Sequence, residues 1–395
     1  MADYTKAYNY EDLRAIARTK LPRGLFEFID RGAEDEVALA NNRQAWDRIK
    51  LEPRTLNGVG GADPASRLFG KDVSMPVAIS PTGIVGLVWF EGEIAAARAA
   101  AKIGIPYSLS TASITPVEAV ARGAPEADLW FQLYVWNKPE LSLQLVDRAR
   151  DAGYRVLVVT TDGAGGANRE YNLRNQFTVP MKITPRATLD VLKRPGWIKN
   201  VMLRSLRANG IPTFANYPPE YQSDVLGRAQ GQGMAALGNP VVTREFLLQI
   251  RERWKGPLLV KGLLSPYDAE LAVECGADGV IVSNHGGRTL DPAVAAIDAL
   301  PAVVQAVGSR VDVLIDSGVR RGSDVAKAVA LGAKAAMTGR LPIWGTAAGG
   351  ADGAYHSLNI LKGELARVMI QLGCATVGDI GPDCLWRRGH ALDEA

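Results

Sequence analysis

Short runs of apolar residues, each ending in polar residues or glycine, recur along the whole chain. They lie at residues 76–80, 105–110, 129–134, 156–160, 257–261, 279–283, 311–316 and 335–339. Hydrophobicity within these runs is continuous rather than alternating, which is typical of strands covered on both faces, as in a parallel sheet. We therefore expect eight largely buried parallel strands.

Alanine-rich segments of helical character separate most of these runs. The clearest examples are residues 93–102, 139–152, 266–275 and 323–331, and a glycine that can end the helix follows each of them, at Gly104, Gly153, Gly276 and Gly332. Eight strand-then-helix units predict an α/β fold of the (β/α)8 TIM-barrel type. A doubly wound open sheet is the alternative, and the sequence disfavours it because it contains no strand–GxGxxG–helix fingerprint.

Two regions fall outside the predicted barrel of residues 76–345. Residues 1–75 are expected to form an N-terminal helical region, with Asn9 as the N-cap of a helix over 11–20. The interval between the fourth and fifth runs is far longer than a normal β-to-β connection, which predicts an insertion at 178–240, after strand 4. Residues 346–395 are expected to add C-terminal helices, so that residues 1–395 form a single domain.

Composition narrows the class of protein. The chain has 395 residues, 47% of them hydrophobic, and its net charge of +3 is too small to indicate nucleic-acid binding by itself. Its three cysteines form no CxxC pair, which fits a reducing compartment without a disulfide framework. The N-terminus lacks the apolar core of a secretion signal, and no apolar run approaches the ~20 residues that span a bilayer. We therefore expect a cytoplasmic protein, either soluble or peripheral to a membrane.

Polar or small residues stand at the carboxyl end of every predicted strand, where TIM barrels place their reactive sites. A barrel with a purely structural role would not need polar groups at all eight ends, so we expect these residues to outline one pocket. They are Pro81, Thr82, Gly83, Ser110, Gln132, Tyr134, Thr160, Asp162, Lys261, Ser283, His285, Asp316, Gly339 and Arg340.

The segment Ser-Asn-His-Gly-Gly-Arg at 283–288 carries the most chemistry. His285 titrates near neutrality, and Arg288 can bind a carboxylate through two parallel hydrogen bonds. Gly286 and Gly287 let backbone and ligand approach closely. The segment predicts chemistry on a small anionic substrate, and the alternative for His285 is a core histidine with no catalytic role.

The loops after the last two predicted strands resemble a phosphate site. Barrels frequently bind phosphate there, through glycine N–H groups and a helix N-terminus, and Arg320 and Arg340 would add charge-assisted hydrogen bonds. Either a phosphorylated substrate or a cofactor with a phosphate tail would fit. The alternatives are tight turns with solvated arginines, a non-catalytic phosphate-binding barrel, and an aldolase barrel in which Lys261 forms a Schiff base.

Four segments, at 131–134, 259–262, 283–288 and 314–324, resemble the family of FMN-dependent (S)-2-hydroxy acid dehydrogenases and oxidases. The resemblance extends from Leu21 to the C-terminal helices. It implies FMN as the cofactor, no metal site and a 2-hydroxy acid as the substrate. By position it implies His285 as the base and Asp162 as the carboxylate that orients it. Arg169 and Arg288 would bind the substrate carboxylate, Tyr134 would lie near the substrate hydroxyl, and Lys261 near the flavin N1 and C2 carbonyl.

The resemblance also implies two sets of FMN contacts. The isoalloxazine and ribityl contacts would be Pro81, Thr82, Gly83, Ser110, Gln132, Thr160 and Ser283. The ribityl and phosphate contacts would be Asp316, Ser317, Gly318, Val319, Arg320, Gly339 and Arg340.

Several positions depart from common family patterns and bear on the substrate. Phe28 stands where many relatives have a tyrosine that binds the substrate carboxylate, while Ala112 and Gly166 replace the bulkier residues of glycolate oxidase. The larger pocket favours an aromatic or long 2-hydroxy acid. Among family members the motifs most resemble (S)-mandelate dehydrogenase, and Gly83 favours a dehydrogenase over an oxidase. An (S)-lactate dehydrogenase and a soluble, oxygen-using oxidase are the alternatives.

The insertion carries a basic segment interleaved with apolar side chains. Between 180 and 210 one acidic residue, Asp190, faces seven basic ones: Lys182, Arg186, Lys193, Arg194, Lys199, Arg204 and Arg207. Such a segment can lie on an anionic membrane surface. We expect residues 181–215 to contact the inner face of the cell membrane, with a membrane quinone as acceptor; a mobile lid is the alternative. The resemblance further implies a homo-oligomer, a tetramer.

Overall fold

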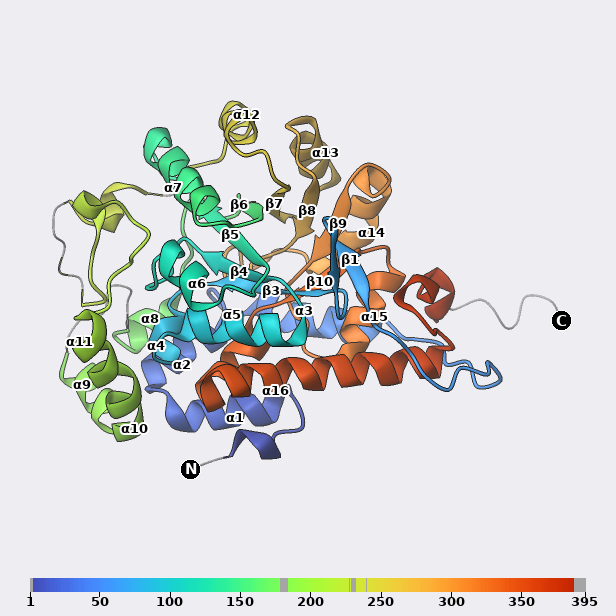
Figure 1. The fold of residues 1–395 in the computed structure, drawn as a ribbon, viewed down its shortest axis with the longest axis horizontal. Coiled ribbons are helices and arrows are strands. Elements are labelled where there is room, and N and C mark those ends of the chain that lie inside the picture. The colour runs from blue at the N-terminus through green and yellow to red at the C-terminus, as the bar shows by residue number, and fades with distance from the viewer. Residues whose placement is uncertain (1–2, 178–183, 227, 229–231, 239, 387–395) are drawn as a thin grey trace.

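Eight parallel strands close into a barrel at the centre of the molecule (Figure 1). The structure, a computed structural model, describes residues 3–177, 184–226, 228, 232–238 and 240–386. The strands follow the order β10-β3-β4-β5-β6-β7-β8-β9 around the barrel. They are β3 (Val77–Thr82), β4 (Tyr107–Ser110), β5 (Leu129–Tyr134), β6 (Val156–Thr160), β7 (Leu258–Leu263), β8 (Gly279–Val282), β9 (Asp312–Ile315) and β10 (Ala335–Thr338). The predicted (β/α)8 barrel is therefore confirmed.

Helices cover the outside of the barrel, and the four clearest helix predictions are confirmed within a residue or two. The outer helices are α4 (Val85–Val88), α5 (Gly92–Ile103), α6 (Val117–Gly123), α7 (Pro139–Asp151), α12 (Arg244–Arg253), α13 (Pro266–Glu274), α14 (Ala296–Val307), α15 (Gly322–Ala330) and α16 (Arg340–Leu372). The backbone of α16 breaks at Gly349 and Gly350, so the expected boundary between residues 345 and 346 falls just before this break.

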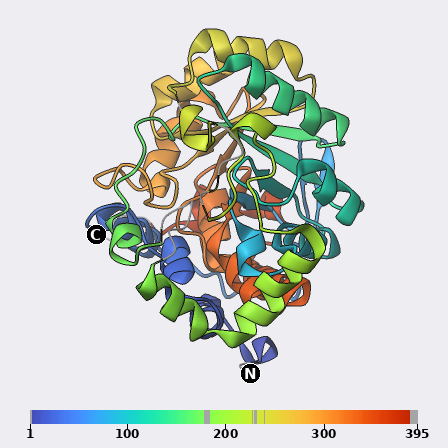
Figure 2. The same cartoon turned by 90° about the vertical axis from the view of Figure 1, so that its left-hand side faces the viewer.

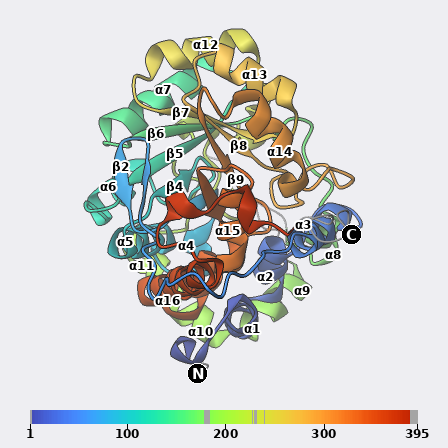
Figure 3. The same cartoon turned by 90° about the vertical axis from the view of Figure 1, so that its right-hand side faces the viewer.

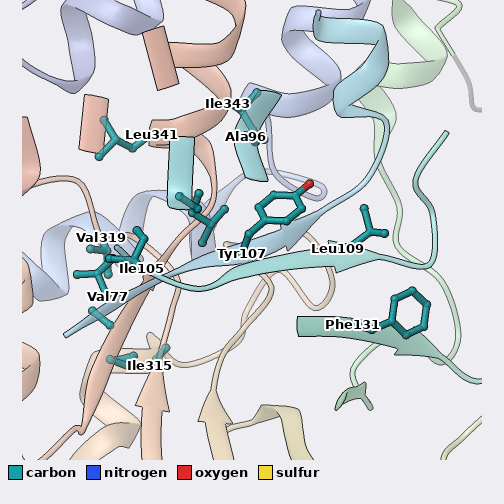
Figure 4. Close-up of a cluster of buried hydrophobic side chains, with 14 of the residues drawn as sticks. Val77, Ala96, Ile105, Tyr107, Leu109, Phe131, Ile315, Val319, Leu341 and Ile343 are labelled. Atoms are coloured by element: carbon teal, nitrogen blue, oxygen red, sulfur yellow. The ribbon is translucent and has the colours of Figure 1, made fainter. Parts of the chain in front are cut away.

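Alternate residues of each strand enter two separate cores, although the strands look uniformly apolar in sequence. One set packs between strands and helices and includes Val77, Tyr107, Leu109, Phe131 and Ile315 (Figure 4). The other set fills the barrel interior and includes Ala78, Trp130, Val158, Leu259, Ile281, Leu314 and Met337. This two-residue period decides which side chains continue into the barrel mouth.

A short hairpin closes the amino end of the barrel. It consists of β1 (Ser66–Leu68) and β2 (Lys71–Val73), paired antiparallel, on the side of the molecule seen in Figure 3. Leu68 joins the interior core, and the Phe69 ring meets Trp130 edge-on at 5.6 Å between centroids. The sequence predicts only a helical region over residues 1–75 and gives no sign of this hairpin, because each strand has three residues and no clear periodicity.

The remaining N-terminal elements pack around the barrel. They are η1 (Tyr4–Lys6), α1 (Tyr10–Lys20), α2 (Arg23–Asp30) and α3 (Val37–Arg48). Asn9 caps α1 as predicted, because its side chain accepts a hydrogen bond from the Asp12 N–H at 2.9 Å. The segment between α2 and α3 reaches the carboxyl end of the barrel, where the Ala33 N–H donates to the Gly287 carbonyl at 2.9 Å.

The insertion between β6 and α12 forms short helices. They are α8 (Glu170–Arg174), α9 (Pro185–Leu192), α10 (Pro195–Trp197), the π-helical turn η2 (Ile198–Met202), α11 (Leu203–Asn209), η3 (Pro219–Tyr221) and η4 (Met234–Ala236). Helices α9 to α11 lie on one flank of the molecule, which faces the viewer in Figure 2. Lys182, named in the basic segment, lies outside the described residues. The C-terminal turns are η5 (Val377–Asp379) and η6 (Pro382–Cys384). None of the helices in the described part of the chain is both long and apolar enough to cross a bilayer.

Candidate active site

The inward-facing layer of the barrel changes from apolar to polar at the carboxyl end. Two residues after the interior Trp130, Val158 and Leu259 come Gln132, Thr160 and Lys261, and the same step leads from Ile281 to Ser283 and from Leu314 to Asp316. The alternate strand positions that face inward are thus apolar in the barrel interior and polar at its carboxyl end.

A cavity of about 240 Å³ opens above this polar layer. Most of the predicted site residues line it: Phe28, Pro81, Thr82, Gly83, Ser110, Ala112, Tyr134, Arg169, Lys261, His285, Arg288, Asp316, Ser317, Gly318, Val319, Arg320, Gly339 and Arg340. Gln132, Thr160 and Ser283 are buried at the strand ends instead. Gly166 lines an adjoining cavity of about 450 Å³, whose wall also includes Phe28, Tyr134, Arg169 and His285.

His285 lies in a strained loop at the end of β8. Its φ of 58° is in the left-handed region, and Gly286 and Gly287 continue in that region with φ values of 68° and 72°. A Cβ on Gly287 would lie 2.5 Å from the Leu39 backbone nitrogen, so only glycine fits there. A histidine in this conformation costs about 1–3 kcal/mol and persists where the surroundings hold it, which is common at functional sites.

His285 links a phenol to a carboxylate. Its Nδ1 lies 3.0 Å from Asp162 Oδ1, and its Nε2 lies 3.2 Å from the Tyr134 hydroxyl. An ionised Asp162 accepts from Nδ1–H, which leaves the Nε2 lone pair toward the Tyr134 hydroxyl. Asp162 itself comes two residues after β6 and is mostly buried.

Burial and nearby cations keep the imidazole neutral. Burial lowers the pKa of His285, and Lys261 and Arg169 lower it further against the opposing effect of Asp162. Burial alone would raise the pKa of Asp162, but its interaction with His285 and the Lys261 ammonium together lower it. A neutral imidazole beside a carboxylate can accept a proton and be stabilised once it has done so.

Lys261 is a buried cation. Its Nζ lies 3.2 Å from Asp316 Oδ2 and donates to Ser283 Oγ at 2.9 Å. Burial alone would lower the pKa of Lys261, but Asp316 and Asp162 outweigh it and raise the pKa. A Schiff-base lysine must be neutral to attack a carbonyl, so this environment argues against the aldolase alternative.

Three arginines at the barrel mouth lack a carboxylate partner within the described residues. They are Arg169, Arg288 and Arg340, and their donors instead reach backbone carbonyls of Arg288, Phe28 and Ile29 at 3.2, 2.8 and 2.9 Å. Burial lowers the pKa of each one, and repulsion within the group adds to the effect for Arg169 and Arg288. Since a guanidinium stays charged in proteins, an anion bound among them would relieve this repulsion.

Unpaired polar atoms mark where a polar ring system would fit. Ser80 Oγ, Gln132 Nε2 and Thr160 Oγ1 are buried and have no hydrogen-bond partner in the described structure. Each such atom costs about 1–3 kcal/mol unless a ligand satisfies it. Their arrangement over three strands, beside Lys261, suits a flat heterocycle with several acceptors and donors, such as the isoalloxazine of FMN.

The phosphate end is formed by the loop after β9 and the start of α16. Ser317 and Gly318 are left-handed, with φ values of 73° and 106°, and they line the cavity together with Arg320 and Arg340. Arg320 is partly neutralised, because it pairs with Glu11 at 3.1 Å and stacks on the Tyr10 ring at 4.4 Å. Arg340 is therefore the stronger candidate for a phosphate contact.

Sequence reasoning missed part of the cavity wall. The missed residues include Tyr10, Ile29, Leu39, Asn42, Arg43, Ser80, Ile84, Phe214, Met337 and Ile343. The two-residue period of β3 could have indicated Ser80, since it shares the inward register of Thr82. Asn42 and Phe214 come from segments outside the barrel, which no strand pattern places.

Comparisons with known proteins identify the family of the chain. The sequence profile of the family described as FMN-dependent dehydrogenase matches residues 17–387. The chain is 39% identical to (S)-mandelate dehydrogenase of Pseudomonas putida over 97% of its own length and 94% of that protein. It is 37% identical to an L-lactate dehydrogenase of Pseudomonas paraeruginosa, covering 95% and 97% of the two chains. A solved structure described as the monotopic membrane protein (S)-mandelate dehydrogenase superposes with a TM-score of 0.88 at 39% identity, over 96% and 99% of the two chains.

Proposed function

This chain belongs to the FMN-dependent dehydrogenase family, and on that premise we propose which substrate it oxidises and which residues act on it. The coarse activity is FMN-dependent oxidation of an (S)-2-hydroxy acid to the 2-oxo acid. Our proposal is that the preferred acid is aromatic, such as (S)-mandelate, and that electrons leave to a membrane quinone. The observation that carries the proposed oxidation is the position of His285 between Asp162 and Tyr134, beside half-buried arginines that have no carboxylate partner in the part of the chain that the structure describes.

The substrate carboxylate would bind Arg169 and Arg288, whose guanidinium groups line the cavity with His285. That contact orients the 2-hydroxyl toward His285 and Tyr134. His285 then takes a proton from the substrate, and Asp162 stabilises the imidazolium that results. The bound FMN supplies the acceptor for the two electrons, and this chain supplies orientation and electrostatics.

The residues present fit FMN. The unpaired Ser80, Gln132 and Thr160 side chains would satisfy the polar edge of the isoalloxazine together with Ser110 and Ser283. The Lys261 ammonium would stabilise negative charge on the ring. The loop over 316–320, with Gly339 and Arg340, would hold the ribityl chain and the phosphate.

The substrate's side chain would occupy the space between the flavin site and the insertion. A Cβ on Gly83 would lie 3.2 Å from the Ala112 Cβ, so the two small residues are neighbours. Neither of them places a bulky side chain in the pocket. A Cβ on Gly166 would meet nothing within 4 Å. Phe28 and Phe214 add aromatic walls, which favours a phenyl group over a methyl.

Membrane contact is supported by the surface of the insertion. Leu189, Leu192 and Leu206 are 55%, 62% and 44% exposed, and they lie among the exposed basic residues Arg186, Lys193, Lys199, Arg204 and Arg207. Exposed leucines among cations suit the interface of an anionic bilayer. The likeness to a monotopic membrane enzyme supports a peripheral location on the cytoplasmic face. By the family resemblance we further propose a homotetramer, which light scattering of the purified protein would test.

One experiment tests the activity directly. The purified yellow protein is mixed anaerobically with (S)-mandelate, (S)-lactate or glycolate, and bleaching of the flavin band is followed. We expect fast bleaching with (S)-mandelate. Faster bleaching with (S)-lactate would select the second candidate, which the similarity to L-lactate dehydrogenases favours. A colourless protein that takes up no FMN would refute the proposal.

A further inference from the structure

Two buried asparagines tie the loop that carries His285 to a helix outside the barrel. Asn42 of α3 and Asn284 are 2% and 1% exposed. Each side-chain amide donates to the other's carbonyl oxygen, and both distances are 2.8 Å. The pair spans 242 residues of sequence and fixes the residue immediately before His285.

The Asn284 amide uses its whole hydrogen-bonding capacity in this position. Its oxygen also accepts from the Gly287 N–H at 3.1 Å, and its nitrogen also donates to the Val294 carbonyl at 3.1 Å. The Asn284 side chain therefore bridges the left-handed turn over 285–287, since it binds the Gly287 N–H at the end of that turn. Asn42 supplies the contact that holds this closed turn against α3.

The other side of the loop rests on Ser317. Its hydroxyl accepts from the backbone N–H groups of Asn284 and Gly286, at 3.2 and 3.0 Å, and donates to Asp316 at 2.8 Å. Removing the Asn42 contact would leave the loop held by Ser317, by the Ala33 bond to Gly287 and by Arg340, which donates to the Gly286 carbonyl at 3.2 Å. A strained turn that loses one of its supports relaxes toward ordinary backbone angles.

We propose that Asn42 is a positioning residue for the reaction: through Asn284 it holds His285 at the angle and depth that proton abstraction requires. The inference rests on the proposed role of His285. Reacting groups must be placed closely, and a misplacement of about 1 Å can slow a reaction about 100-fold. Asn42 lies 243 positions before His285 and outside the barrel strands. The strand-and-helix pattern of the sequence therefore does not indicate that the position of His285 depends on Asn42.

The test compares Asn42→Ala and Asn42→Asp with the wild-type holoenzyme. Asn41→Ala is the matched control, since Asn41 is the neighbour on α3 and its amide oxygen reaches only Arg48, at 3.5 Å. The Asn42→Asp variant keeps the size of the side chain and loses the donor to Asn284. Flavin content, the anaerobic rate of flavin reduction at saturating (S)-2-hydroxy acid, and the pH dependence of kcat/KM are measured.

We expect both Asn42 variants to retain flavin and to reduce it at least about 10-fold more slowly, with the control unchanged. A loosened loop admits water around His285, so the acid limb of the pH profile should move to higher pH. The inference is overturned if Asn42→Asp reduces flavin at the wild-type rate, or if activity falls only in proportion to lost flavin with the pH profile unmoved. Wild-type protein that no 2-hydroxy acid reduces would instead refute the proposed function.

Discussion

At the scale of single residues, the protonation of His285, the proposed base, should govern the pH at which the enzyme works. Burial lowers the pKa of His285 below its ordinary value near 6.5, and Lys261 and Arg169 add to this effect. The base is active when neutral, so kcat/KM should rise with pH through a midpoint below about 6.5 and then level off. A pH series with a substrate that stays ionised throughout checks this. A midpoint clearly above that value would contradict the neutral-imidazole assignment.

Removing the imidazole of His285 should slow flavin reduction without preventing FMN binding. His285 touches Asp162 and Tyr134, while the phosphate loop and the polar strand ends are independent of its side chain. His285→Ala should therefore keep its yellow colour and reduce its flavin about 10²–10⁴-fold more slowly than the wild type. Stopped-flow bleaching under nitrogen measures the rate. Reduction at a normal rate in this variant would disprove the role of His285 as the base.

Phe28 offers a gain-of-binding test. Its ring lies against Arg288, with 5.4 Å between the guanidinium carbon and the ring centroid, and it lines both cavities. A hydroxyl at this position could donate to the substrate carboxylate, so Phe28→Tyr should lower KM by about 10-fold with little change in kcat. Phe28→Leu, which adds no donor, serves as the control. An unchanged KM in the tyrosine variant would show that the carboxylate lies elsewhere.

At the scale of elements, the strands were predictable because each one is buried on both faces and ends in a polar residue. The register of β5 illustrates this: Trp130 enters the interior, Gln132 the polar layer and Tyr134 the mouth. The β1–β2 hairpin and the contributions of Asn42 and Phe214 were not predictable. These contacts join segments that are distant in sequence, and their geometry depends on tertiary packing rather than on local period.

The α9 helix should be the main site of membrane contact. Asp190 accepts from the N–H groups of Arg23 and Gly24 at 3.0 and 2.9 Å, which fixes α9 with Leu189 and Leu192 outward. Each leucine inserted into a bilayer interface contributes on the order of 1–2 kcal/mol. Leu189→Gln with Leu192→Gln should therefore shift the enzyme from sedimented vesicles to the supernatant.

Substitution is a cleaner test of membrane contact than deletion of residues 181–215. Trp197 is buried and donates to the Leu87 carbonyl at 2.7 Å, and Phe214 lines the active-site cavity. A deletion would remove both. Leu248→Gln on α12, a leucine that is 43% exposed on a different helix, is the matched control and should leave partitioning unchanged. Equal sedimentation of all three proteins would refute the contact.

At the scale of the whole molecule, the active site and the proposed membrane surface share one flank. The cavity lined by Gly166 also includes Asn172 and the 67% exposed Leu173 of α8. Helix α2 contacts both α8 and α9, and the two helices lie on the same side of the molecule (Figure 1). Under the proposed membrane contact, an acceptor dissolved in the bilayer would approach the cavity past Leu173, whereas a soluble acceptor would not need the membrane.

This arrangement makes the choice of acceptor testable. With vesicles that contain a long-tailed quinone, the wild type should turn over (S)-2-hydroxy acid much faster than with oxygen, and little peroxide should form. The Leu189→Gln and Leu192→Gln double variant should lose about 10-fold or more of the quinone-dependent rate, because fewer molecules reside on the vesicle, and should keep its rate with a water-soluble dye. The dye reaction controls for damage to the active site. Peroxide produced at the rate of substrate oxidation would instead identify an oxidase. If the double variant lost the same share of its rate with the quinone and with the dye, α9 would have no specific role in electron transfer to the quinone.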